Sequence, residues 1–139
     1  MKKALGMMGL VLGLCACQSA SDPGFYDNLW RLDASQVKGP LATAARSVKG
    51  ITLKLSSDGR LSGEGGCNRY FADYQLVNGA AMTVGHIGST KMACMGELMQ
   101  AEGLYLDRLQ KANWLERDGA NLKLFSDGFE SPLVFVPSP

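Results

Sequence analysis

The sequence predicts a mainly β protein, a small antiparallel barrel-like domain of about six to eight strands with one α-helix. Short stretches in which apolar and polar residues alternate are separated by Asp-Gly and Asn-Gly pairs, which favour tight turns. One segment, approximately residues 97–112, has a helical period instead. Many short strands with a single helix are typical of a curved antiparallel sheet whose opening or edge the helix covers.

The first predicted strand lies in "NLWRLDAS", residues 28–35, where leucine and arginine alternate around a tryptophan. A connection of small and polar residues, "GPLATAARSVKG" (39–50), is expected to follow it. The clearest hairpin spans residues 51–66, because apolar residues alternate before the Asp58-Gly59 turn and the alternation resumes after it.

A second hairpin is predicted over residues 74–88, with its turn at Asn78-Gly79. The C-terminal stretch, residues 114–136, predicts three further strands. The turns between these strands are expected at Asp118-Gly119 and Asp127-Gly128.

The predicted helix has one apolar face, formed by residues at three- and four-residue steps. Gly103 lies inside this segment and weakens the helix by about 1 kcal/mol relative to alanine. The residues of the apolar face are Leu98, Ala101, Tyr105, Leu109 and Ala112.

Residues 1–16 are expected to be a lipoprotein signal peptide. Two lysines precede an apolar run from Ala4 to Leu14, which is too short for a permanent membrane helix of about 20 residues. The following "LCAC", residues 14–17, resembles a bacterial lipobox. This resemblance implies cleavage before Cys17 and a diacylglycerol thioether on its sulfur. An ordinary signal peptide with an incidental cysteine is the alternative.

The expected mature chain consists of a lipidated tether, residues 17–24, and one domain, residues 25–139. The residue after Cys17 is Gln18 rather than aspartate. In a Gram-negative lipoprotein this favours export to the outer membrane, with the domain facing the periplasm. Two of the 14 basic residues precede Cys17, so 12 basic and 13 acidic side chains remain in the mature chain. No run of like charge occurs, which disfavours nucleic acid as a partner.

Two cysteines remain once Cys15 is removed and Cys17 is acylated. In an exported protein, this even remainder of Cys67 and Cys94 suggests a structural disulfide. Across their 27-position separation, a bridge would stabilise the fold by about 3–4 kcal/mol on the chain-entropy model. Two buried free thiols are the alternative. A redox role would prefer a close Cys-x-x-Cys pair, which is absent from the sequence.

Three stretches together resemble a known family. They are "GGCNRYFADYQL" (65–76), "HIGSTKMAC" (86–94) and "LMQAEGLYLDRLQ" (98–110). The sequence is similar to the META domain, found in HslJ-type heat-shock proteins and in many small bacterial lipoproteins, over roughly residues 25–136. The residues that carry the family motif are Gly65, Gly66, Asn68, Arg69, Thr90, Met92, Ala93 and Glu102.

The resemblance implies a compact antiparallel β fold with one helix and no established catalytic activity. It also implies an envelope role, because the best-known bacterial member of the family is associated with heat stress and novobiocin resistance. Met95-Gly96 stands where family members often carry prolines, which bears only on how the helix begins.

The glycine-cysteine stretch itself is interpreted as a bend in the backbone. Glycines after a strand favour a bulge or corner, Cys67 would fasten it, and Asn68 tolerates a left-handed backbone and caps its own turn. Arg69 is expected to pair with Glu102 on the helix, by charge alone. Use of the corner as a binding patch is the alternative.

No catalytic residues, metal site or cofactor are predicted. His86 is the only histidine and has no ligand partners at suitable spacing, and the carboxylates of Glu64, Glu97 and Glu102 give no sign of convergence. A Cu(I) site is the alternative use of four sulfur residues, but we expect two of them, Met95 and Met99, to fill core space. The four are Met92, Cys94, Met95 and Met99.

The sequence therefore predicts a non-catalytic envelope lipoprotein that binds a protein or envelope component, with a role in stress or drug tolerance. One alternative is a carrier that holds a small apolar ligand inside the barrel, which requires interior space. Another is an inhibitor of an external hydrolase that presents a rigid loop, for which residues 39–50 are the candidate.

Overall fold

The computed structural model describes residue 13 and residues 24–139. The predicted acylation site at Cys17, nearly all of the predicted signal peptide and most of the predicted tether lie outside the described residues. The described elements are β1 (Leu29–Leu32), the 3-10 turn η1 (Ala34–Gln36), α1 (Pro40–Arg46), β2 (Thr52–Leu55), β3 (Arg60–Glu64), β4 (Arg69–Val77), β5 (Ala81–Val84), β6 (Gly88–Ser89), α2 (Glu97–Gln110), β7 (Ala112–Asp118), β8 (Asn121–Ser126) and β9 (Leu133–Pro137).

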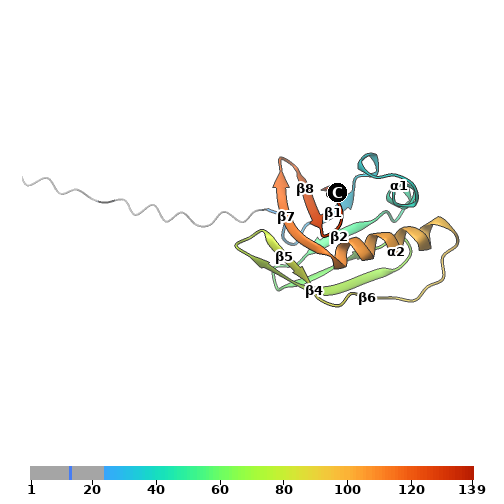
Figure 1. Ribbon diagram of the computed structural model, residues 1–139, viewed down its shortest axis with the longest axis horizontal. Coiled ribbons are helices and arrows are strands. Elements are labelled where there is room, and N and C mark those ends of the chain that lie inside the picture. Colours follow the sequence, from blue (N-terminus) through green and yellow to red (C-terminus); the bar gives the residue numbers. More distant parts are fainter. Residues whose placement is uncertain (1–12, 14–23) are drawn as a thin grey trace, which may run out of the picture.

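The strands form one antiparallel sheet that closes on itself (Figure 1). Its order is β3-β2-β1-β9-β8-β7-β5-β4, and the pairing of β3 with β4 completes the ring. The two-residue strand β6 pairs with the first half of β4, beyond the stretch that pairs with β5. The predicted barrel-like β fold is confirmed, and so are the hairpin turns at Asp58-Gly59 and Asn78-Gly79.

The described residues contain two α-helices, whereas the sequence predicted one. Residues 39–50, expected to be a connection, contain α1, which begins at Pro40 and packs against α2. Proline is favoured in the first helical turn, and Leu41, Ala44 and Ala45 are buried at helical spacing. Most of residues 39–50 is therefore helix, and only residues 47–50 form the kind of loop that the inhibitor hypothesis needed.

Helix α2 begins at Glu97 as predicted but ends at Gln110, before the expected limit at residue 112. Ala112 already belongs to β7 and pairs with Ser126 of β8. The Ser126 hydroxyl donates a 2.7 Å hydrogen bond to the carbonyl of Arg108, which satisfies one of the free carbonyls at the helix end. The pairing of β7 with β8 thus fixes where the helix stops.

Large side chains fill the inside of the barrel. Aromatic rings of Tyr70, Tyr105 and Phe135 contact one another edge to face, with centroids 5.5 and 6.4 Å apart, and all three are buried. Leucines from six strands and from α2 complete this core. They are Leu32, Leu53, Leu55, Leu61, Leu109, Leu115, Leu122, Leu124 and Leu133.

Candidate functional site

The turn between β3 and β4, residues 65–68, lies between the two helices. Gly66 has φ +108°, and a Cβ there would lie 3.3 Å from the Ala44 Cβ of α1 and 3.5 Å from the Leu98 carbonyl of α2. The Gly65 amide closes the turn by donating to the Asn68 carbonyl, 2.8 Å away. The glycine pair therefore serves as the predicted bend, because the backbone there needs both a positive φ and close approach.

Glu102 of α2 is only 6% exposed, and Asn68 holds its carboxylate. The Asn68 backbone amide donates to Oε1 at 2.6 Å, and the Asn68 side-chain amide donates to Oε2 at 2.9 Å. Among the described residues, no basic side chain forms an ion pair with Glu102. Two amide donors rather than a cation thus satisfy this buried charge.

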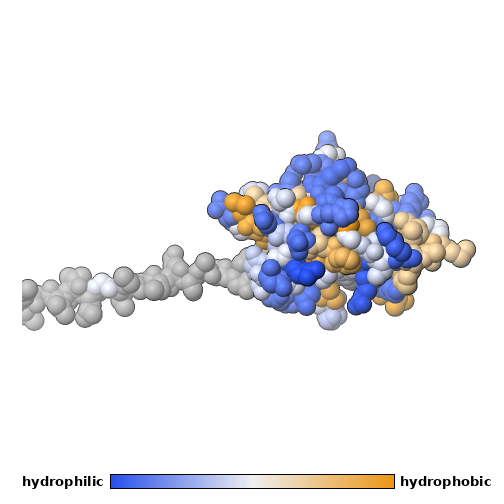
Figure 2. Space-filling view, turned by 90° about the horizontal axis from the view of Figure 1, so that it is seen from below, coloured by the Kyte–Doolittle hydropathy of each residue, from blue (hydrophilic) through white to orange (hydrophobic). Residues whose placement is uncertain are grey.

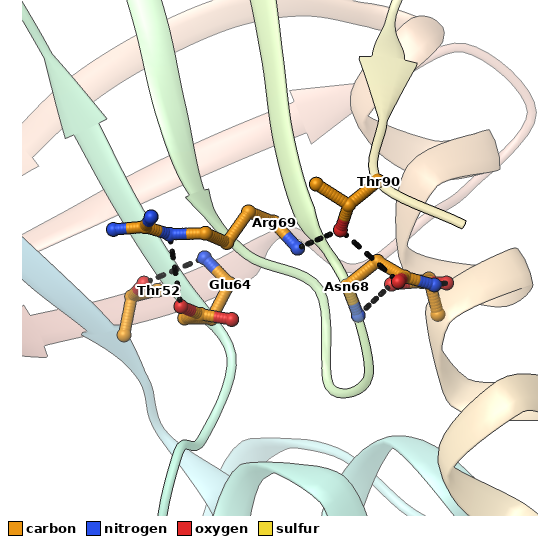
Figure 3. A network of polar contacts seen from close by, with 6 residues as sticks. Thr52, Glu64, Asn68, Arg69 and Thr90 are labelled. Atoms are coloured by element: carbon orange, nitrogen blue, oxygen red, sulfur yellow. Dashed lines mark hydrogen bonds and ion pairs between the residues drawn. The ribbon is translucent and has the colours of Figure 1, made fainter. Parts of the chain in front are cut away.

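The predicted ion pair between Arg69 and Glu102 is wrong. Arg69 is the first residue of β4 and its side chain lies on the outer face, where its guanidinium is 3.6 Å from the carboxylate of Glu64 (Figure 3). Glu64 is its direct neighbour across β3 and β4. Strand alternation places Arg69 and Glu102 on opposite sides of the sheet.

Asn68 also binds the segment that leads into α2 (Figure 3). Its Oδ1 accepts hydrogen bonds from the Met92 amide at 2.7 Å and the Thr90 hydroxyl at 3.1 Å, and its Nδ2 reaches the Met92 carbonyl at 3.3 Å. Asn68 satisfies backbone groups as predicted, but they belong to this distant segment rather than to its own turn. It is also not among the residues with a left-handed backbone.

The predicted disulfide between Cys67 and Cys94 is present, with the two Cα atoms 5.9 Å apart. Together with Asn68, it holds residues 90–94 against the β3–β4 turn. Ala93 is exposed in this segment.

The methionines around this segment face solvent. Met95 is 92% exposed, and Met92 and Met99 are about half exposed, so the expectation that Met95 and Met99 fill core space is wrong. The reason is that the buried face of α2 begins at Ala101. Cys94 is bonded to Cys67 and supplies no thiolate, and the described residues contain no cluster of three or more His, Cys, Asp or Glu.

A groove of about 700 Å³ lies on the outer face of the barrel, over β1 to β4. The strand register arranges its side chains in two adjacent rows across the sheet. One row runs Leu29, Lys54, Ser62, Phe71, and the next runs Thr52, Glu64, Arg69, Thr90. We call this the outer groove; Lys49 lies at its rim, in the loop before β2.

The outer groove combines apolar and cationic side chains. Phe71 is 49% exposed, and its ring lies over Gly88, where an added Cβ would be 2.6 Å from a ring carbon. Leu29 is 41% exposed at the other end of the same row. From the side of β4 and β6, apolar atoms occur in small areas between polar ones rather than as one continuous face (Figure 2).

Inside the barrel, the two buried tyrosine hydroxyls are paired by hydrogen bonds. The buried hydroxyls of Tyr70 and Tyr105 are 2.7 Å apart, and the Tyr70 hydroxyl donates to the Thr52 carbonyl at 2.6 Å. Burial raises the pKa of both phenols well above the ordinary value. Neutral, mutually bonded hydroxyls of this kind satisfy each other and stabilise a filled core.

The predictions about site residues have mixed outcomes. The structure gathers Gly65, Gly66, Asn68, Thr90, Met92 and Glu102 at one corner, and places Arg69 in the outer groove beside it. Sequence reasoning missed the other groove residues, because each one looks like an ordinary outward position of its own strand. Within residues 24–139, none of the helices is long and apolar enough to cross a membrane.

The fold and the site define the class of protein: a small, closed antiparallel β-barrel with a filled interior, two helices and an open groove on its outer face. The chain belongs to the META domain family, which matches residues 25–138. This match confirms the family resemblance of the sequence.

Two solved structures show the same fold. A protein from Burkholderia xenovorans, determined by NMR, is 27% identical, with a TM-score of 0.60, over 99% of this chain and 95% of that one. A crystal structure of a DUF4847 family protein from Bacteroides vulgatus is 14% identical, with a TM-score of 0.57, over 81% of this chain and 93% of that one. A comparison with curated protein sequences gives no match.

Proposed function

We propose that the protein is a non-catalytic, lipid-anchored envelope protein whose META domain binds another envelope component through the outer groove. The outer groove carries this proposal, because it is a concave surface of about 700 Å³ that combines apolar and charged side chains. Sites for ligands are typically concave and largely apolar, with a few polar groups that fix orientation.

The anchor is the acyl group predicted on Cys17, and the outer membrane facing the periplasm is the proposed location. The anchor would keep the domain at the membrane surface, where envelope components are concentrated. The stress or drug-tolerance role rests on the family resemblance alone.

Two features of the structure weigh against the alternatives. Fully buried side chains occupy the interior, which weighs against an apolar ligand inside the barrel. Most of the candidate inhibitory loop is the helix α1, whose apolar side chains are buried, so only the short stretch 47–50 remains as a loop.

The proposal is tested by native mass spectrometry of the complete protein, gently extracted from its own membranes. The mass reports acylation at Cys17, and a bound component appears as a defined additional mass. The double variant Lys54→Gln/Phe71→Ala should lose that component. The matched variant Lys123→Gln/Trp114→Ala, with a lysine and an exposed aromatic on β8 and β7, should keep it. A complex retained equally by both variants would contradict binding through the outer groove, and an unacylated mass would contradict the anchor.

A further inference from the structure

We propose that the outer groove binds a small amphipathic organic anion, in which a carboxylate or phosphate group is attached to a flat apolar body. This inference rests on the proposed function and names the class of ligand for the same site.

The charge of the groove is positive. Lys49, Lys54 and Arg69 line it, against the single carboxylate of Glu64, whereas the predicted mature chain is close to neutral overall. Arg69 pairs with Glu64, but neither lysine forms an ion pair with any described carboxylate. Two uncompensated ammonium groups around one concave surface favour an anionic ligand.

The apolar ring of Phe71 lies in the same groove as these cationic side chains. The Phe71 ring lies close against Gly88 and is 49% exposed, so part of the ring is available to a ligand as an apolar platform. Lys54 lies two strands away in the same row, which corresponds to about 10 Å between backbones at a strand spacing of ~4.8 Å. A ring stacked on Phe71 would therefore bring an attached acid group within reach of the flexible Lys54 side chain and of Arg69.

The floor between these groups is polar and small. Ser62 stands between Lys54 and Phe71, and the Thr52 hydroxyl already accepts a hydrogen bond from the Glu64 amide at 2.9 Å. A hydroxyl that accepts a hydrogen bond can still donate one, so both Ser62 and Thr52 can donate from the floor to a bound acid.

The same surface fits a peptide strand or a membrane poorly. The strands β1 to β4 are each paired on both sides in the closed ring, so they offer no free backbone edge to a peptide. A flat bilayer would contact the rim of the groove, at Lys49 and Phe71, but would not reach Ser62 and Thr52 on its floor. A small ligand can contact both the rim and the floor of the groove.

The test titrates the complete chain with three probes and follows backbone amide shifts by NMR. The probes are 2-naphthoate, which has both the flat body and the charge, 2-naphthol, which is neutral at pH 7, and acetate, which lacks the apolar body. We expect 2-naphthoate to shift the amides of Thr52, Ser62 and Phe71 in a saturable manner. 2-Naphthol and acetate should each bind about tenfold more weakly or worse, because each lacks one of the two contacts.

Four variants locate the binding energy. Lys54→Gln should weaken 2-naphthoate binding by about three- to fivefold and Phe71→Ala by about five- to tenfold, because each removes one contact of an exposed site. The controls Lys123→Gln and Trp114→Ala, across the barrel, should leave the dissociation constant within about twofold. Equal binding of 2-naphthoate and 2-naphthol, or saturable shifts centred on Trp114, would overturn the proposal.

A further experiment with lipid vesicles distinguishes binding of a small anion from binding of a membrane surface. If the chain binds phosphatidylglycerol vesicles in a Lys54-dependent manner while 2-naphthoate leaves Ser62 and Thr52 unshifted, the surface contacts lipid and the small-anion inference is wrong. If 2-naphthoate fails but the native component still depends on Lys54 and Phe71, the ligand class is wrong and the proposed function stands.

Discussion

Substitution of Asn68 by alanine tests whether the Asn68–Glu102 contact holds the corner together. The change removes four side-chain hydrogen bonds. Loss of the bond to the buried carboxylate of Glu102 should cost about 1.5–3 kcal/mol, and loss of the acceptor for the Met92 amide about 0.5–1.5 kcal/mol. The other two bonds, at 3.3 and 3.1 Å, lie where water can replace them and contribute little. The expected loss in the free energy of unfolding is therefore about 2–4 kcal/mol.

The measurement is equilibrium unfolding in urea with the disulfide kept oxidised, so that residues 90–94 stay linked to the turn. With a denaturant slope of about 2 kcal/mol/M, the midpoint should fall by about 1–2 M. Asn113→Ala is the matched control, because the Asn113 amide also donates to a carboxylate, that of Asp127, but at the exposed surface. Its effect should stay within about 0.5 kcal/mol. Equal midpoints for the Asn68 and Asn113 variants would refute the reasoning.

Three further predictions concern the disulfide, the buried phenols and the methionines. Replacement of Cys67 and Cys94 by serine should lower the free energy of unfolding by about 3–4 kcal/mol, measured in urea against the oxidised parent. An unchanged midpoint would contradict a stabilising role for the disulfide. Because burial raises the pKa of Tyr70, the unfolded chain loses its phenol proton first as the pH rises above about 10, so stability should fall there by about 1.4 kcal/mol per pH unit for each such tyrosine. Unfolding at a series of alkaline pH values should show a shallower fall for Tyr70→Phe, and an identical slope would oppose the assignment. Met95→Ala should change stability by less than about 0.5 kcal/mol, whereas Leu109→Ala should cost about 2–5 kcal/mol by thermal or urea unfolding; comparable losses would show that Met95 packs in the core.

The hairpins could be predicted from the sequence because their signals are local. Asn78 and Gly79 have φ of 54° and 73°, and Gly59 has φ of 91°, which are conformations that asparagine and glycine tolerate better than other residues. Each turn is therefore specified by two neighbouring residues, and the strands on either side only have to alternate. Helix α1 was missed because its helical period is carried by alanines, which look like a small-residue connection until α2 is seen to cover them.

The corner could be predicted only in part, for a reason of geometry. Its residues were identified, but charge alone paired Arg69 with Glu102, while the true donor to Glu102 is the neighbouring residue Asn68. A shift of one residue at the start of a strand moves a side chain from the inner to the outer face. A strict reading of the alternation in β4, where Tyr70 is buried and Phe71 exposed, places Arg69 outside and rules out its contact with the inward-facing Glu102.

The outer groove could not be predicted at all, because it exists only through the register of four strands. Lys54, Ser62 and Phe71 are far apart in sequence and become neighbours when β2 pairs with β3 and β3 with β4. A closed barrel of eight strands has an interior just wide enough to be filled by its own side chains, and here tyrosine, phenylalanine and leucine side chains fill it. Closure therefore removes both the free edges and the internal cavity as places to bind a partner. The outer face remains, and our proposal places binding there, on side chains such as Lys54 and Phe71, which the shared fold does not determine.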